Sequence, residues 1–317
     1  MGSNAQVVIM KNSMYTKYMA HTPTVKGFFD IHTNTISYVV ADPETKDCVV
    51  IDSVLDYEPN GASLSYESAD ALIAYIQEHE YRVVWILETH VHADHLSAAP
   101  YIQEKLGGKL GIGRRIVEVQ EVFGKVFNAG TSYKVDGSQF DALWDDGDTF
   151  MVGNIPALVL HVPGHTPADV AYVIGDAVFV GDTLFMPDYG TARCDFPGGN
   201  AETLYASVQR LFTLPDEMRM FLCHDYLPEG RSKYVWETTV GEQRKQNIHI
   251  HDGVAQEIFT QMRKDRDATL GMPKLIIPSI QVNIGGGVLP KDEETKSVCF
   301  KIPVNSIFAK RYKYLVG

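Results

Sequence analysis

The stretch Val83–His95, VVWILETHVHADH, constrains the fold of this chain more than any other feature. Its first seven residues form a continuous, mainly apolar run, which is typical of a strand buried on both faces of a sheet. Three histidines and an aspartate then follow within six residues, at His90, His92, Asp94 and His95. Such a cluster directly after a buried strand predicts a metal site at one edge of an α/β sheet.

The composition is that of a globular protein, with 45% hydrophobic and 21% charged residues in a chain of 317. This length suits one large domain or two small ones, and it is ample for a substantial core. A formal net charge of -12 repels phosphate backbones and anionic lipid, so we expect neither a nucleic-acid nor a membrane-surface partner. The sequence has no long apolar run and no apolar leader near its start, which favours a cytoplasmic protein.

The four cysteines, Cys48, Cys194, Cys223 and Cys299, are scattered and include no CxxC pair. This usage fits a reducing compartment and excludes a thiolate zinc site built on that motif. Because neighbouring residues on a strand point to opposite faces, we expect Cys223 to face the core if His224 faces the site.

Hydrophobic periodicity and turn signals predict alternating strands and helices. The predicted strands are the hairpin Thr35–Val40 and Asp47–Asp52, then Val83–Thr89 and the segments PALVLHV, VAYVI, AVFVGD and MRMFLCHD. The predicted helices are Ser68–Glu80, a helix capped by Ser97 with Pro100 in its first turn and its end at Gly107, Thr203–Phe212, and a polar helix within residues 241–264. Residues 109–160 are expected to contain further strands and loops.

These elements predict one α/β catalytic domain over residues 25–245, preceded by an N-terminal segment, 1–24. Residues 246–317 are expected to form a C-terminal helix and an extension packed on the same domain. Prolines and the triple glycine at 285–287 suggest that residues 272–317 wrap the core as an ordered extension. The same non-core character motivates the expectation of a homodimer built through this segment.

Three more candidate ligands stand at the ends of later predicted strands, at His165, Asp182 and His224. Strand ends on one edge of a sheet can converge on a single point. Taken singly, each of these residues is as well explained by a structural role, but their joint occurrence at successive strand ends favours one metal centre.

Two kinds of site can be built from these seven side chains. If all are ligands, His90, His92 and His165 hold one ion, Asp94, His95 and His224 hold a second, and Asp182 bridges them. This is the arrangement of a two-zinc hydrolase with a bridging hydroxide. If only His90, His165 and Asp182 are ligands, the result is a two-histidine, one-carboxylate face suited to Fe(II) and oxygen. Counting ligands leaves both options open.

The motifs THVHADH and PGHT, the Gly-Asp pair at 181–182 and His224 resemble the metallo-β-lactamase superfamily. The resemblance extends over about residues 25–230 and implies an αββα sandwich with metals at the sheet edge. It also implies that Asp52, at the end of an early strand, orients a ligand from outside.

The flanking segments LFMPDYGTARCDFPGGN, after Asp182, and HDY, from His224, resemble the persulfide dioxygenases. The later segment PSIQVNIGGGVLP is similar to the bacterial subgroup of that family. This resemblance implies one Fe(II) per chain and oxidation of glutathione persulfide by O2 to sulfite. The iron ligands carried over by motif are His90, His165 and Asp182.

The same resemblance places Arg193 and Tyr226 against glutathione, with His92, Asp94, His95 and His224 supporting the iron from outside. A salt bridge to Asp195 is the alternative role for Arg193. Cys194 is a candidate substrate contact, although passive packing is the favoured reading, and mitochondrial relatives have threonine at this position.

The nearest rival is a two-zinc thioester hydrolase of the glyoxalase II kind, which shares both the ligands and the glutathione moiety. No basic helical substrate domain of that kind is evident after residue 250. A scaffold protein with an unused metal pocket is the alternative from another class, and the complete ligand set argues against it.

Overall fold

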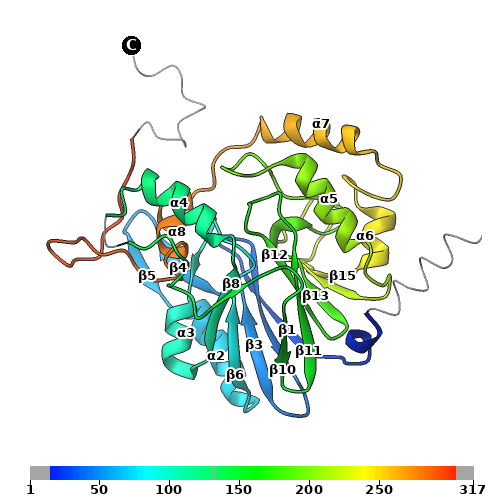
Figure 1. Cartoon of the computed structure of the whole chain (residues 1–317), viewed down its shortest axis with the longest axis horizontal. Helices are drawn as coiled ribbons and strands as arrows, with labels where there is room; N and C mark the ends of the chain where they lie inside the picture. The colour runs from blue at the N-terminus through cyan, green and yellow to red at the C-terminus, as the bar shows by residue number, and fades with distance from the viewer. Residues whose placement is uncertain (1–14, 131–132, 305–317) are drawn as a thin grey trace, which may run out of the picture.

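Two six-stranded sheets pack face to face between two layers of helices (Figure 1). The structure is a computed structural model that describes residues 15–130 and 133–304. The first sheet comprises β1 (Thr24–Asp30), β2 (Thr35–Ala41), β3 (Asp47–Ile51), β6 (Arg82–Leu87), β8 (Lys109–Gly113) and β9 (Ala142–Trp144), in that spatial order. The predicted αββα sandwich is therefore confirmed.

The second sheet comprises β10 (Thr149–Val152), β11 (Ile155–His161), β12 (Val170–Ile174), β13 (Ala177–Phe179), β14 (Arg219–Phe221) and β15 (Glu237–Thr239), again in spatial order. A small third sheet comprises β4 (Val54–Glu58), β5 (Ser63–Ser65) and β7 (Leu96–Ser97). The helices are α2 (Glu67–Glu78), α3 (Ala99–Leu106), α4 (Ile116–Val126), α5 (Ala201–Leu211), α6 (Val240–Gln246), α7 (Gln256–Asp267) and α8 (Ile276–Asn283). Figure 1 shows α2, α3, α4 and α8 on the side of the first sheet and α5, α6 and α7 on the side of the second.

The strands are apolar on both faces because each sheet packs against its partner on one side and against helices on the other. In β2, Ile36, Tyr38 and Val40 face the core between the sheets, whereas Val39 and Ala41 face the helices of the first layer. Strand β12 of the second sheet divides its side chains between two cores in the same way. Three cores between four layers follow directly from this alternation.

Strand direction brings the candidate ligands to one edge. Strand β12 is antiparallel to both β11 and β13, and β13 is parallel to β14. Strands β11, β13 and β14 therefore run the same way and end at the same edge of the second sheet. At that edge the backbone N–H of Ile36 donates to the carbonyl of Cys223 at 2.7 Å, which joins the two sheets.

Most predicted elements are present with small shifts of their ends, but the region from 109 to 160 is different. It contains α4, so the prediction of strands and loops alone is wrong there. Ile116, Val119 and Phe123 are buried along one helical face. The β-branched residues of this segment hide that spacing, because they also favour strands.

Helix α3 begins one residue later than predicted. Its cap is Ala98, and Ser97 lies in β7 instead. The Ser97 hydroxyl still accepts a hydrogen bond from the N–H of Ala99 at 3.1 Å, and it donates to Glu88 at 2.5 Å. The predicted polar helix at 241–264 is divided into α6 and α7.

The described part of the C-terminal extension, up to residue 304, includes α8, which its proline and glycine content did not suggest. Pro278 is the third residue of α8, a position whose N–H has no partner within a helix. Ile276 and Ile280 pack into the core of the first helical layer. The remainder of the predicted extension, 305–317, and residues 1–14 of the predicted N-terminal segment lie outside the described residues.

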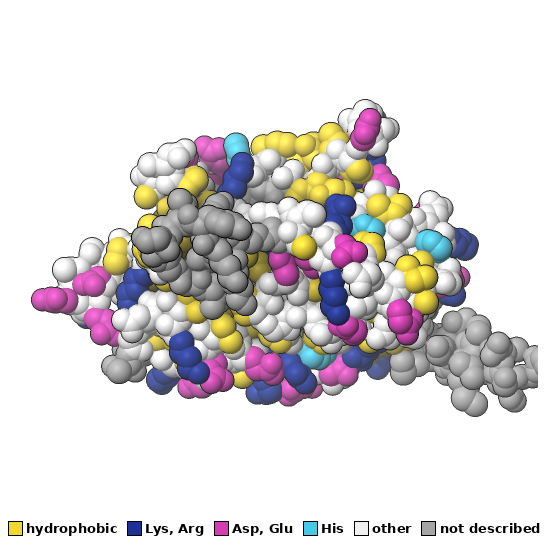
Figure 2. Space-filling model, turned by 90° about the horizontal axis from the view of Figure 1, so that it is seen from above, with side chains coloured by type: hydrophobic (Ala, Val, Ile, Leu, Met, Phe, Trp, Pro, Cys, Tyr) yellow, Lys and Arg dark blue, Asp and Glu magenta, His cyan; other side chains and the backbone are white. Residues whose placement is uncertain are grey.

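Acidic and basic side chains are interspersed over the face seen in Figure 2. Among residues 15–130 and 133–304, no helix combines the length and the apolar character needed to cross a membrane.

Candidate metal centre

All seven predicted ligands meet where the two sheets join. His90, His92, Asp94 and His95 follow β6, and the loop after β11 carries His165. Asp182 lies in a short 3-10 turn, Gly181–Thr183, after β13, and His224 follows β14. Six of the seven side chains are buried, and Asp94 is 24% exposed. The structure therefore assembles from four separate segments the cluster that strand ends predicted.

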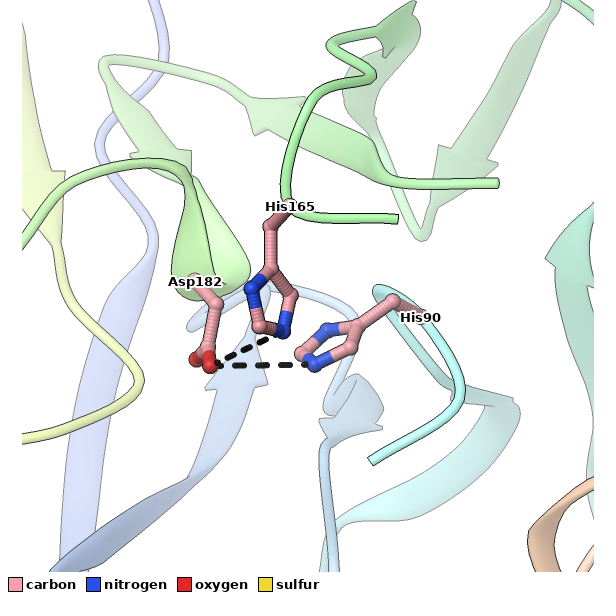
Figure 3. A group of neighbouring side chains, drawn as sticks. All are labelled: His90, His165 and Asp182. Carbon is pink, nitrogen blue, oxygen red and sulfur yellow. Dashed lines mark ion pairs between the residues drawn. The ribbon is translucent and has the colours of Figure 1, made fainter. Parts of the chain in front are cut away.

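The first group of ligands consists of His90, His165 and Asp182 (Figure 3). Oδ2 of Asp182 lies 3.9 Å from Nε2 of His90 and 3.5 Å from Nε2 of His165. Both rings thus turn the same nitrogen toward one carboxylate oxygen. This arrangement is the two-histidine, one-carboxylate face expected of a mononuclear site.

The second group lies on the other side of the same aspartate. Oδ1 of Asp182 is 3.2 Å from Nε2 of His224, and Oδ2 of Asp94 is 3.4 Å from that nitrogen. Asp94 and His95 also form a group with His92 in which the ligand atoms all lie within 4.8 Å of one another. Asp182 therefore faces both groups, as a bridging carboxylate does.

Three ligand-type nitrogens in this region are buried without a hydrogen bond among the described residues. They are Nε2 of His90, Nδ1 of His92 and Nε2 of His95. Buried polar atoms without partners are rare and costly in native proteins. Their concentration at one point fits a metal ion as the missing partner, so the donor set present is suited to metal binding.

The rings of the first group are held from outside by uncharged oxygens. Nδ1 of His90 lies 2.9 Å from the hydroxyl of Thr89. Nδ1 of His165 lies 2.8 Å from the carbonyl oxygen of Arg193 and can donate to it. A donor bond at Nδ1 leaves the Nε2 lone pair free to bind a metal, so these contacts set the tautomer as well as the ring orientation.

His92 is held differently, by two carboxylates. Its Nε2 lies 3.0 Å from Asp52 and 3.2 Å from Glu88, so it turns Nδ1 toward the centre. Asp52 also accepts hydrogen bonds from the N–H of Thr89 at 2.7 Å and from its hydroxyl at 2.8 Å. Asp52 thus supports the loop that carries both His90 and His92, which is the orienting position expected for it.

The remaining two rings of the second group contact the start of β2. Nδ1 of His224 lies 3.1 Å from the carbonyl oxygen of Asn34, and Nδ1 of His95 lies 3.3 Å from the hydroxyl of Thr35. The β1–β2 turn of the first sheet therefore positions a ligand candidate that the second sheet supplies.

Burial and neighbouring charge shift the pKa values of the centre in opposite directions. Burial, together with the nearby His92, holds the pKa of His90 well below its usual value. Burial also lowers the pKa of His92, but Asp52 and Glu88 outweigh it and hold that pKa well above the usual value. Burial likewise opposes protonation of His224, but Asp182 and Asp94 raise its pKa to about 9. The two groups therefore differ in electrostatics as well as in position.

A cavity of about 1090 Å³ opens onto the centre. Asp94, His165 and Asp182 line it, whereas His90 and His92 are not among its lining residues. Its volume is at the upper end of the range for small-molecule sites. The aromatic residues Phe185, Tyr189 and Tyr226 form one wall of it.

Arg193 and Tyr226, the predicted substrate contacts, both line this cavity. Nε and one terminal nitrogen of Arg193 donate to Asp195 at 2.6 and 2.8 Å, and its other terminal nitrogen donates to the carbonyl of Gly271 at 2.6 Å. The salt bridge anticipated as the alternative role of Arg193 is thus present. The ring of Tyr226 lies against those of His224 and Tyr189, with centroids 5.5 and 4.9 Å away.

Cys194, the third predicted contact, is not among the residues that line this cavity. Its side chain packs into the core beneath α5, and its backbone N–H donates to Asp267 at 2.8 Å. Burial, reinforced by the Asp267 carboxylate, raises the pKa of its thiol.

The expectation for Cys223 is wrong. Its Sγ lies 3.6 Å from Oδ2 of Asp52, and it forms a close group with Asp182 and His224. Strand β14 ends at Phe221, two residues earlier, so the alternation of a strand no longer governs where Cys223 points. Burial and the carboxylate of Asp52 hold the pKa of this thiol well above its usual value.

Glu88 contacts His92 in the centre, but it is not among the site residues predicted from the sequence. The sequence shows only that Glu88 precedes His92 by four residues, and this spacing predicts a contact in a helix but not in a loop. Its contact with His92 depends on the turn that the chain makes after β6.

The fold and the centre together define an αββα metal-binding protein. Residues 33–224 match the metallo-beta-lactamase superfamily, and the chain belongs to that family.

Similar proteins fall into two groups by name. A probable metallo-hydrolase of Burkholderia pseudomallei is 51% identical over 90% of this chain and 100% of its own length, and a protein of Dictyostelium discoideum named glyoxylase B2 is 45% identical over 90% and 99%. The human mitochondrial persulfide dioxygenase ETHE1 is more distant, at 31% identity over 64% of this chain and 68% of its own. The crystal structure of ETHE1 from Myxococcus xanthus matches with a TM-score of 0.66 and 29% identity, over 84% of this chain and 100% of that one.

Proposed function

We propose that this protein is a persulfide dioxygenase that oxidises glutathione persulfide with O2 at a single Fe(II) held by His90, His165 and Asp182. The observation that carries the proposal is the geometry of the first group, in which two Nε2 atoms face one oxygen of Asp182. These three residues would hold Fe(II), and a bound iron with so few protein ligands would be suited to the reaction of a sulfur with O2. The homology to the dioxygenase ETHE1 supports the same reading.

The reaction balances with water as the third reactant. One persulfide, one O2 and one water give one thiol, one sulfite and two protons, and the terminal sulfur supplies the electrons that reduce both oxygen atoms. The sulfur–sulfur bond breaks and its thiol remains on glutathione. Bound Fe(II) would supply the one-electron chemistry that O2 requires.

The protein's own residues supply orientation and shelter. The carbonyl of Arg193 holds His165, so the loop that lines the cavity also fixes an iron ligand. The aromatic wall of Phe185, Tyr189 and Tyr226 gives the cavity an apolar surface beside the centre. For Arg193 to bind a glutathione carboxylate, the substrate must replace Asp195 or Gly271 as a partner of its guanidinium group.

A two-zinc thioester hydrolase of the glyoxalase II kind is the second candidate. Oδ1 of Asp182 lies near His224 while Oδ2 serves the first group, which is the geometry of a bridge. The relative named glyoxylase B2 supports this candidate.

The two functions are separated by measuring metal content and two activities on one preparation. The dioxygenase is expected to bind one iron per chain, to consume O2 when glutathione persulfide is added and to release sulfite. Two bound zinc ions, with hydrolysis of a glutathione thioester and no oxygen uptake, would instead establish the hydrolase.

A further inference from the structure

The last residue of α8, Asn283, contacts the segment after β6 that carries His90, His92 and His95. This segment, residues 88–97, is called the histidine loop. Its Nδ2 donates to the carbonyl oxygen of His92 at 2.9 Å and to that of His95 at 2.8 Å. Its Oδ1 accepts a hydrogen bond from the N–H of Ser97 at 2.8 Å. The side chain is only 5% exposed. Both donors of the amide and its acceptor are thus used on one loop.

Helix α8 is itself anchored, so Asn283 approaches the loop from a fixed position. Ile276 and Ile280 are buried in the core of the first helical layer. Beyond the end of the helix, the carbonyl of Ile284 accepts hydrogen bonds from Gln120 at 2.9 Å and from the hydroxyl of Tyr133 at 2.8 Å. These contacts hold the C-terminal end of α8 against the body of the domain.

The three glycines after α8, residues 285–287, allow the chain to pass close to the same loop. Gly286 and Gly287 have φ values of 67° and 84°, which side chains rarely tolerate. A Cβ at Gly287 would lie 2.5 Å from Cδ of Pro100 and 3.1 Å from the carbonyl oxygen of Ser97. The close approach of these backbones explains the glycines.

The histidine loop needs such support because it turns away from the sheet. Buried carbonyl groups outside a strand or helix must find partners elsewhere. Asn283 is the partner of two such carbonyls, those of His92 and His95, whose rings belong to the second group of ligands. The match to the metallo-beta-lactamase superfamily ends at residue 224, so this support comes from outside the shared domain.

We propose that Asn283 is a positioning residue of the metal centre, and that its amide fixes the backbone of the loop from His92 to Ser97 and thereby the aim of the His92 and His95 rings. The inference does not depend on whether the centre oxidises or hydrolyses its substrate. It makes α8 a structural part of the centre.

The test compares Asn283→Ala with Gln281→Ala on the same helix. Gln281 is also a buried amide with three hydrogen bonds, but its partners are Ile277 and Lys301. Each metal-free protein is titrated with Zn²⁺ against a chelator, and amide hydrogen exchange is followed at Ser97. Asn283→Ala is expected to weaken Zn²⁺ binding by at least about tenfold and to accelerate exchange at Ser97. Gln281→Ala is expected to leave both unchanged.

Thermal unfolding of the metal-free variants separates positioning from general stability, because both substitutions remove three buried hydrogen bonds. If Asn283→Ala does not fold, Asn283→Ser is used, since its hydroxyl can still serve one carbonyl and an intermediate loss is expected. Equal Zn²⁺ affinity in the Asn283 and Gln281 variants would overturn the proposal, whatever the exchange at Ser97. Neither readout involves turnover, so a failure here is distinct from a failure of the dioxygenase assignment.

Discussion

The two groups of ligands in this centre use the same side-chain types but are supported in partly different ways. In the first group, the outer nitrogens of His90 and His165 contact a hydroxyl and a carbonyl, both uncharged. In the second group, the outer nitrogen of His224 also contacts a carbonyl, but that of His92 lies between two carboxylates and that of His95 lies 3.4 Å from Asp94. Carboxylates therefore support part of the second group and none of the outer nitrogens of the first.

The comparison shows why counting ligands cannot assign the chemistry. Histidines supported by neutral groups present a lone pair to a metal without further change. Histidines surrounded by carboxylates already have charged partners, and they can support the adjacent site as well as bind a second ion. The same seven side chains therefore suit either one metal or two.

The largest expected effect is that of His165→Ala compared with His95→Ala. With one iron in the first group, His165→Ala is expected to lose iron and to lower oxygen uptake by about a thousandfold or more. His95→Ala should retain iron and lose about tenfold. Iron content and oxygen uptake on glutathione persulfide are measured for both. Equal losses of metal and activity in the two variants would show that both groups bind metal.

A smaller effect is expected when the support beneath the histidine loop is changed. Asp52→Asn and Glu88→Gln both disturb His92, but Asp52→Asn also disturbs Thr89 and through it His90, whereas the Glu88 side chain contacts Ser97. We therefore expect Asp52→Asn to weaken iron binding by about 10- to 100-fold and Glu88→Gln to weaken it less. Chelator competition measures both affinities. The reverse order would place the principal metal in the second group.

The smallest effect concerns the loop that holds His165. Nδ1 of the partly buried His249 accepts a hydrogen bond from the N–H of Thr191 at 3.0 Å. Burial and the nearby Arg263 and Arg266 lower the pKa of His249 to about 4. The folded protein therefore keeps this ring neutral at pH values where the unfolded chain protonates it, so its contribution to stability is present above about pH 6.5 and is lost as the pH falls toward 4.

Unfolding midpoints measured between pH 7 and pH 4 test this expectation. His249→Gln should flatten the fall of the midpoint over that range, whereas a matched change of the exposed His251 should leave the profile as it is in the unchanged protein. An unaltered profile in His249→Gln would assign the acid sensitivity to other groups, including those of the metal centre.

The sequence predicted the fold, and also that the candidate ligands lie together, because both depend on local patterns. Val83–Thr89 has the apolar run of a buried strand, and each ligand stands just after such a run. Helix α4 was missed because its β-branched residues also suit strands. The alternation of side chains predicts which face a residue occupies only within a strand. Cys223 lies beyond the end of β14, so the direction of its side chain could not be predicted in this way.

The supporting contacts could not be predicted, because they join residues far apart in the chain. Asn283 lies about 190 positions after the loop that it contacts, and nothing in its neighbourhood marks it. Its three hydrogen bonds exist only once α8 has packed on the first sheet. The same holds for the carbonyls of Asn34 and Arg193, since every residue carries such a group whatever its side chain.

The spread of the centre along the chain also sets when it can form during synthesis. His90 follows a strand of the first sheet, while Asp182 and His224 follow strands of the second. A chain still emerging from the ribosome can therefore complete its first sheet without being able to hold a metal in the first group. The histidine loop gains its last support only when residue 283 has been made. The first group of ligands is therefore complete only after Asp182 has been made, and the centre with all of its described supports requires the chain through residue 283.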